Sequence, residues 1–171
     1  MYVHGFRLPA PPAAGSVGSM TRAPTRATKA EAPVLSPCVC ATLRRVTRAV
    51  TQMYDDALRP SGLRATQFSM LATLARLGEA NLRQLEDAMA LDQTTLTRGL
   101  NLLERDGLIE RVPHPDGRVK ALRLTAKGRK TLEIARPLWA KTQATVLGEL
   151  GPRAWGDAQR RLARLLSVAT R

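Results

Sequence analysis

The sequence predicts a mainly helical protein with one small β-hairpin, and two observations lead to this fold class. Two short amphipathic helix patterns follow each other between residues 81 and 107, and the second has a polar outer face. A turn rich in proline and glycine then separates two short runs that are typical of strands. A helix-turn-helix followed directly by a hairpin is a winged helix-turn-helix. Longer helices are expected on either side of it.

The two short helices are marked by their capping residues and apolar spacing. The first is expected over residues 81–91, with Asn81 as its N-cap. Asp92 caps the second helix, which should end at Gly107, because glycine commonly terminates helices. Its inward stripe consists of three leucines, Leu96, Leu100 and Leu103.

The opposite face of the second helix carries amide, hydroxyl and guanidinium groups. These groups match base edges and phosphates in the major groove of double-stranded DNA. Glutamine and asparagine pair with adenine, arginine pairs with guanine, and threonine can meet a thymine methyl group. The sequence therefore predicts a DNA-reading helix whose contact residues are Gln93, Thr94, Thr95, Thr97, Arg98 and Asn101.

The hairpin is expected to pair residues 108–112 with residues 119–124, and Thr125 should then cap a helix that begins at Ala126. Arg118 stands at the turn, where a guanidinium can enter a narrow, negatively charged minor groove. The carboxylate of Asp116 can fix the direction of that guanidinium. The predicted DNA contacts of the hairpin are Asp116, Arg118 and Lys120.

These segments closely resemble the MarR family of bacterial transcriptional regulators. The resemblance covers about residues 38 to 168 and includes the stretches LDQTTLTRGLNLLERDGLIER and LRPSGLRATQFSMLATLARLG. In the wing it rests on Asp116, Arg118, Leu124, Thr125 and Gly128. It implies a homodimer that binds a pseudo-palindromic DNA operator, usually as a repressor.

Charge agrees with a nucleic-acid partner. Lysine plus arginine number 27 against 14 acidic residues, which gives a net charge of +13 and attracts polyanions. A solvated arginine-rich surface would also account for this charge. A nonspecific architectural DNA-binding protein would explain it as well, but not the polar face of the second helix.

Other classes of protein are disfavoured. The chain has no nucleophile–base–acid set and no phosphate-binding loop, so we expect no enzyme. No cysteine or histidine cluster suggests a metal, and no cofactor is expected. No apolar run approaches the roughly 18 residues that span a bilayer, so no transmembrane segment is expected. The resemblance to a family of bacterial regulators implies a location in the bacterial cytoplasm, in association with the nucleoid.

The chain divides into four predicted segments: a disordered tail over residues 1–36, a dimerisation helix over 37–60, the winged helix-turn-helix over 61–125, and C-terminal dimerisation helices over 126–171. The first helix should begin near Ser36 and Pro37. Pro137 should kink the long C-terminal helix, and the last helix should start at Gly151 and Pro152. The first helix carries an apolar seam of Val39, Leu43, Val46, Val50, Met53 and Ala57.

The sequence is compatible with two different triggers for release from DNA. Cys38 and Cys40 fall in the first turn of the first helix, where the positive end of the helix dipole favours thiolates. A redox switch is one interpretation, and two small buried residues are the other. The family resemblance also implies a small aromatic acid as effector, in a cleft that Arg48 and Phe68 could line.

Overall fold

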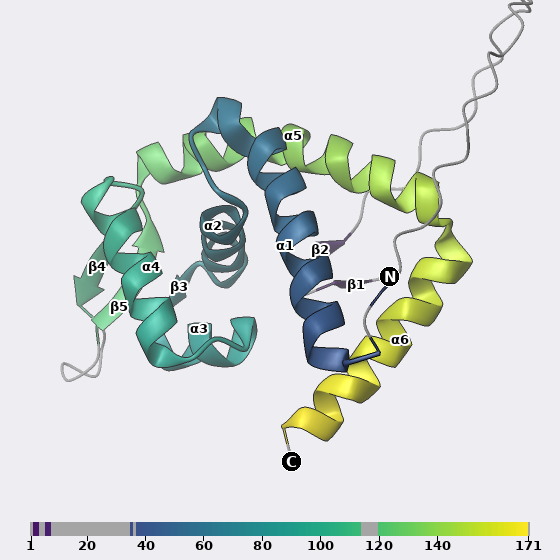
Figure 1. Cartoon of the computed structure of the whole chain (residues 1–171). Coiled ribbons are helices and arrows are strands. Elements are labelled where there is room, and N and C mark those ends of the chain that lie inside the picture. Colours follow the sequence, from purple (N-terminus) through teal and green to yellow (C-terminus); the bar gives the residue numbers. More distant parts are fainter. Residues whose placement is uncertain (1, 4–5, 8–34, 36, 114–119, 171) are drawn as a thin grey trace, which may run out of the picture.

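The structure is a computed structural model that describes residues 2–3, 6–7, 35, 37–113 and 120–170 (Figure 1). The first helices are α1 (Val39–Leu58), a 3-10 turn η1 (Arg59–Ser61) and α2 (Ala65–Leu77). A short strand β3 (Glu79–Ala80) leads to the pair α3 (Leu82–Met89) and α4 (Gln93–Arg105). The strands β4 (Ile109–Pro113) and β5 (Lys120–Leu124) precede the long helix α5 (Ala126–Leu150) and the last helix α6 (Pro152–Ala169).

These elements separate into two groups that α5 connects. Figure 1 shows α2, α3, α4 and the small sheet on one side, which we call the winged-helix lobe. The helices α1 and α6 lie on the other side, and α5 runs from the sheet across to α6. The predicted fold class, mainly helical with a small β wing and terminal helices outside it, is therefore confirmed.

The wing contains one strand more than the sequence predicts. The sheet has the antiparallel order β3-β5-β4, with Ala80 opposite Leu122 and Ile109 opposite Leu124. The strand β3 is only two residues long, too short for a periodic pattern to reveal it. The turn between β4 and β5, with Asp116 and Arg118, lies outside the described residues.

One apolar core supports the winged-helix lobe. The leucine stripe of α4 is buried as predicted. It packs with side chains of α2, β4 and α5 in the same cluster, which includes Leu71, Leu74, Ile109 and Leu132. Burial of such side chains stabilises a fold by about 1.5–3 kcal/mol each, so this stripe fixes which face of α4 remains outside.

Three predicted N-caps are confirmed. Asn81 Oδ1 accepts from the backbone N of Gln84 at 2.9 Å, and Asp92 Oδ1 accepts from that of Thr95 at 2.9 Å. Thr125 Oγ1 accepts from the backbone N of Gly128 at 3.0 Å. Each bond satisfies one of the backbone donors that the first turn of a helix leaves open.

One helix boundary differs from the sequence prediction. The helix α1 begins at Val39, with Cys38 as N-cap, rather than at Ser36 and Pro37. Cys38 has an extended backbone (φ −73°, ψ 117°), and its carbonyl accepts the first helical bond from Thr42 N at 3.0 Å. The helix α5 has the predicted bounds, Ala126–Leu150, and contains Pro137, and α6 starts at Pro152 as predicted.

Four residues of the predicted disordered tail form two short paired strands in the structure. The strands β1 (Tyr2–Val3) and β2 (Phe6–Arg7) pair antiparallel, where the sequence predicts no regular structure. Backbone pairing between dipeptides needs no side-chain pattern, so composition did not indicate it.

Among the described residues, no helix has the length and apolar character to cross a bilayer.

Candidate nucleic-acid interface

The helix α4 presents the predicted polar face because its leucine stripe is buried on the other side. Gln93, Thr94, Arg98 and Asn101 are exposed, and Thr97 is half-buried. Thr95 is exposed as well, so all six residues predicted on this helix are accessible in whole or in part. Their assignment as DNA contacts stays a prediction.

The sixth, Thr95, has a structural role that the sequence analysis missed. Its hydroxyl donates to Asp92 Oδ2 at 2.7 Å, in addition to the backbone bond that caps the helix. The hydroxyl bond to Thr95 is the main reason why the pKa of Asp92 lies below its ordinary value. With its hydrogen engaged, Thr95 Oγ1 keeps only lone pairs, which phosphate oxygens cannot use.

A wing residue holds the C-terminal half of α4. Arg111 Nε donates to both carboxylate oxygens of Glu104 at 3.0 Å each, and Arg111 Nη2 donates to Asn101 Oδ1 at 3.1 Å. The two carboxylate oxygens share one N–H of the guanidinium, and the opposite charges of the two groups strengthen this hydrogen bond. Arg111 therefore orients the Asn101 side chain through one lone pair of its Oδ1 atom and does not engage its NH2 group. Arg111 follows no motif, so no sequence signal indicated this role.

A second arginine links the three strands of the sheet. Arg123 Nε donates to Glu110 at 2.8 Å, and Arg123 Nη1 donates to Glu79 at 3.5 Å. The hydrogen bond with Glu110 and the negative charge of that residue raise the pKa of Arg123. Lys120 pairs with Pro113 through the backbone, and its side chain lies outside the described residues, as do Asp116 and Arg118.

The terminal helices carry apolar side chains that one chain alone leaves in solvent. Val39 on α1 and Leu166 on α6 are each 56% exposed. Other exposed apolar side chains of these two helices are Val46, Val50, Met53, Leu162 and Val168. A groove of about 590 Å³ separates the start of α1 from the end of α6. It is lined by Val39, Cys40, Leu43, Arg44, Thr47, Arg48, Leu165 and Ala169.

Both cysteines are exposed, and neither forms a disulfide bond. Cys38 is the N-cap of α1, and Cys40 lines the groove beside α6. In the single chain, therefore, they are not two small buried residues.

The two residues suggested for an effector cleft lie apart in the part of the chain that the structure describes. Phe68 is only 5% exposed and stacks on Trp139, whereas Arg48 is exposed and lines the groove between α1 and α6. Phe68 lies on the buried face of α2, and Arg48 lies on a different helix. Their assignment to an effector site stays a prediction.

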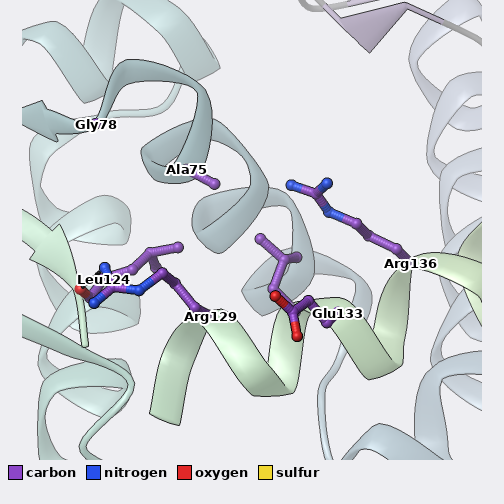
Figure 2. Close-up of a pocket in the computed structure, with 7 residues that line it drawn as sticks. Ala75, Gly78, Leu124, Arg129, Glu133 and Arg136 are labelled. Carbon is purple, nitrogen blue, oxygen red and sulfur yellow. Dashed lines mark hydrogen bonds between the residues drawn. The ribbon is translucent and has the colours of Figure 1, made fainter. Parts of the chain in front are cut away.

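A smaller cavity of about 280 Å³ lies between α2, the end of β5 and the first half of α5 (Figure 2). Arg129 Nη1 donates to the Leu124 carbonyl at 2.9 Å at one end. Figure 2 shows Arg136 reaching from α5 towards α2 at the other end, with Glu133 between them. Within the described ranges, no group of three or more potential metal ligands is present.

Comparison with known proteins agrees with this geometry. A model of the MarR family matches residues 63–120. The chain is 42% identical to the M. tuberculosis transcriptional regulator MosR, whose crystal structure in complex with DNA it matches with a TM-score of 0.71. The match covers 78% of this chain and 96% of MosR. The chain belongs to the MarR family.

Two further MarR-like relatives are more distant. An uncharacterized HTH-type transcriptional regulator of Bacillus subtilis (strain 168), YwoH, is 26% identical over 102 residues, which are 60% of this chain and 74% of YwoH. A MarR variant from E. coli, complexed with operator DNA, is 23% identical with a TM-score of 0.67 and shares the fold over 72% of this chain and 90% of that chain. The MarR family consists of transcriptional regulators, so the predicted class of regulator rather than enzyme is confirmed.

Proposed function

We propose that this MarR-family protein is a homodimeric, sequence-specific DNA-binding regulator that represses transcription from a pseudo-palindromic operator. The observation that carries the proposal is the exposed polar face of α4, which a buried leucine stripe holds outward. A helix of this kind fits the width of the major groove, and its side chains suit base edges. The relative MosR, at 42% identity, has a crystal structure with DNA, which supports the same partner here.

A homodimer is supported by the apolar side chains of α1 and α6. Contiguous apolar surface on a soluble chain commonly marks an interface. Both terminal helices carry it; α6 lies at the end of α5 far from α4, and α1 lies between α6 and the winged-helix lobe (Figure 1). A two-fold dimer through these helices would present two copies of α4 to one face of the DNA.

Thiol oxidation is the first candidate trigger. A peroxide would convert one thiolate to a sulfenic acid, and the other thiol would displace water from it to form a disulfide. Cys38 is the N-cap of α1 and Cys40 lies in its first turn, so a bond between two cysteines this close along the chain would distort the backbone at the start of α1. Because this turn borders the groove against α6, oxidation would change the proposed dimer interface.

A small aromatic acid is the second candidate trigger. The groove beside Arg48 offers a guanidinium next to apolar walls, which suits a carboxylate on an aromatic ring. The same binding assay separates the two triggers, because only the oxidative one requires the thiols of Cys38 and Cys40.

The test is a gel-shift titration with the upstream promoter region of the protein's own gene and with random DNA of equal length. Specific binding should be tighter by about 10³-fold or more. Equal affinity for both DNAs would favour the architectural alternative. Peroxide should then release wild-type protein but not the Cys38→Ser, Cys40→Ser double variant. Release of both would remove the thiols from the mechanism.

A further inference from the structure

Three consecutive backbone carbonyls after α4 accept hydrogen bonds from the first residues of α5. The Asp106 carbonyl accepts from Lys127 Nζ at 2.7 Å. The Gly107 carbonyl accepts from Thr125 Oγ1 at 2.7 Å, and the Leu108 carbonyl accepts from Thr125 N at 3.1 Å. The turn that ends α4 is thus bonded, residue by residue, to the turn that starts α5.

The two turns also approach too closely for a side chain between them. A Cβ atom added to Gly128 would lie 1.9 Å from the Leu108 carbonyl oxygen, which is backbone and cannot move aside as a side chain would. Gly128 is buried, and its N–H donates to Thr125 Oγ1. The Thr125 hydroxyl therefore joins both sides, since it accepts from α5 and donates to the turn after α4.

We propose that this contact, residues 106–108 with residues 125–128, sets the orientation of α4 relative to α5 and so fixes the operator spacing that the dimer accepts. We name it the α4–α5 joint. Thr125 and Lys127 act in it as positioning residues. The inference rests on the proposed DNA-binding function and adds to it the element that determines half-site spacing.

The length of α5 makes the orientation at this joint consequential. At about 1.5 Å per residue, a helix of this length extends about 37 Å from the joint towards α6. A rotation of about 5° at one end would displace the other by about 3 Å, close to the rise of one base pair. Loss of hydrogen bonds at the α4–α5 joint should therefore widen the range of half-site spacings that the dimer binds by about one base pair.

The experiment compares operators whose centres have the native length, one base pair more and one base pair fewer. Thr125→Val removes the hydroxyl bond to the Gly107 carbonyl and the cap bond from Gly128 N, and Thr125→Ser retains both. Thr131→Val is the matched control, because Thr131 Oγ1 donates to the Lys127 carbonyl inside the same helix and bridges no other element. Random DNA serves in each case as the measure of nonspecific affinity.

We expect Thr125→Val to lose about five- to tenfold in affinity for the native operator, the loss typical of one net hydrogen bond. It should bind the three spacings alike, with unchanged affinity for random DNA. Thr125→Ser and Thr131→Val should keep the wild-type preference. If Thr125→Val kept it too, the inference would be overturned, while the proposed function would stand. If wild-type protein bound operator and random DNA equally, both would fall.

Lys127→Met keeps the test decisive if Thr125→Val does not fold, as judged by circular dichroism. This variant keeps an aliphatic stem of similar length and loses only the bond from Nζ to the Asp106 carbonyl. It should bind the three spacings more evenly than wild type after correction for random DNA. An unchanged spacing preference would overturn the inference.

Discussion

Phe68 of α2 stacks on Trp139 of α5, with ring centroids 5.7 Å apart and ring planes 21° apart. The contact joins the winged-helix lobe to the helix that leads towards α6. Aromatic pairs at this separation add about 0.5–1.5 kcal/mol beyond their buried area. The stack is therefore part of the framework that holds the lobe against α5, rather than the wall of a ligand cleft.

Phe68→Ala should lower the free energy of unfolding by about 3–5 kcal/mol, the usual cost of emptying a buried aromatic site. Urea denaturation of the purified protein measures this. Ile134→Ala on α5 is the control, because Ile134 is exposed and its loss should change stability little. A small stability change in Phe68→Ala, together with lost response to aromatic acids, would restore the pocket interpretation.

Arg98→Ala should weaken operator binding by about 1–3 kcal/mol per half-site if Arg98 makes a good base contact. Its side chain is exposed on α4, so the dimer and its thermal stability should not change. Arg153→Ala removes the same charge from an exposed position on α6 and controls for net charge. Operator affinity of Arg98→Ala within twofold of wild type, at fixed salt, would exclude this contact.

Loss of Asp116 should raise DNA affinity if only net charge matters, and lower it if its carboxylate orients Arg118. Arg118→Ala should lower affinity and reduce the slope of log K against log salt by about 0.9 for each lost phosphate contact. Asp116→Ala should also weaken binding if the carboxylate orients Arg118, although it removes a negative charge. Salt titrations of both variants decide the point, and tighter binding by Asp116→Ala would show that only net charge matters.

The cap of α4 predicts a pH dependence. Because the folded-state pKa of Asp92 is lowered, mainly by the Thr95 hydroxyl, its stabilising contribution is complete above the unfolded value of about 3.9 and is lost as pH falls through the lowered pKa. Asp92→Asn keeps an acceptor that does not titrate. The difference in melting temperature between wild type and this variant should therefore be larger at pH 6 than at pH 3. An equal difference at both values would exclude a role for Asp92 ionisation.

Local signals in the sequence predicted most of the fold. Caps such as Asn81, Asp92 and Thr125 satisfy backbone donors only a few residues away, so their effect is visible along the chain. The leucine stripe of α4 likewise follows from the helical repeat alone. These two local features were enough to predict which face of α4 is exposed.

What the sequence did not predict depends on contacts between distant segments. Arg111 reaches Asn101 and Glu104 only because β4 lies beside the end of α4. The pairing of β3 with β5 brings together residues 44 positions apart, such as Glu79 and Arg123. The burial of Phe68 depends on Trp139, which is on another helix. None of these partners follows from the spacing of residues along the chain.

The most direct test of the account inserts five base pairs at the centre of the operator. A dimer with two copies of α4 in successive major grooves needs half-sites centred about 10–10.5 base pairs apart, and the insertion turns one half-site by roughly half a turn. Gel-shift titration against random DNA measures the result. The account predicts that specific binding falls to the level of random DNA. Retained specific affinity would contradict a two-fold dimer that reads both half-sites through α4.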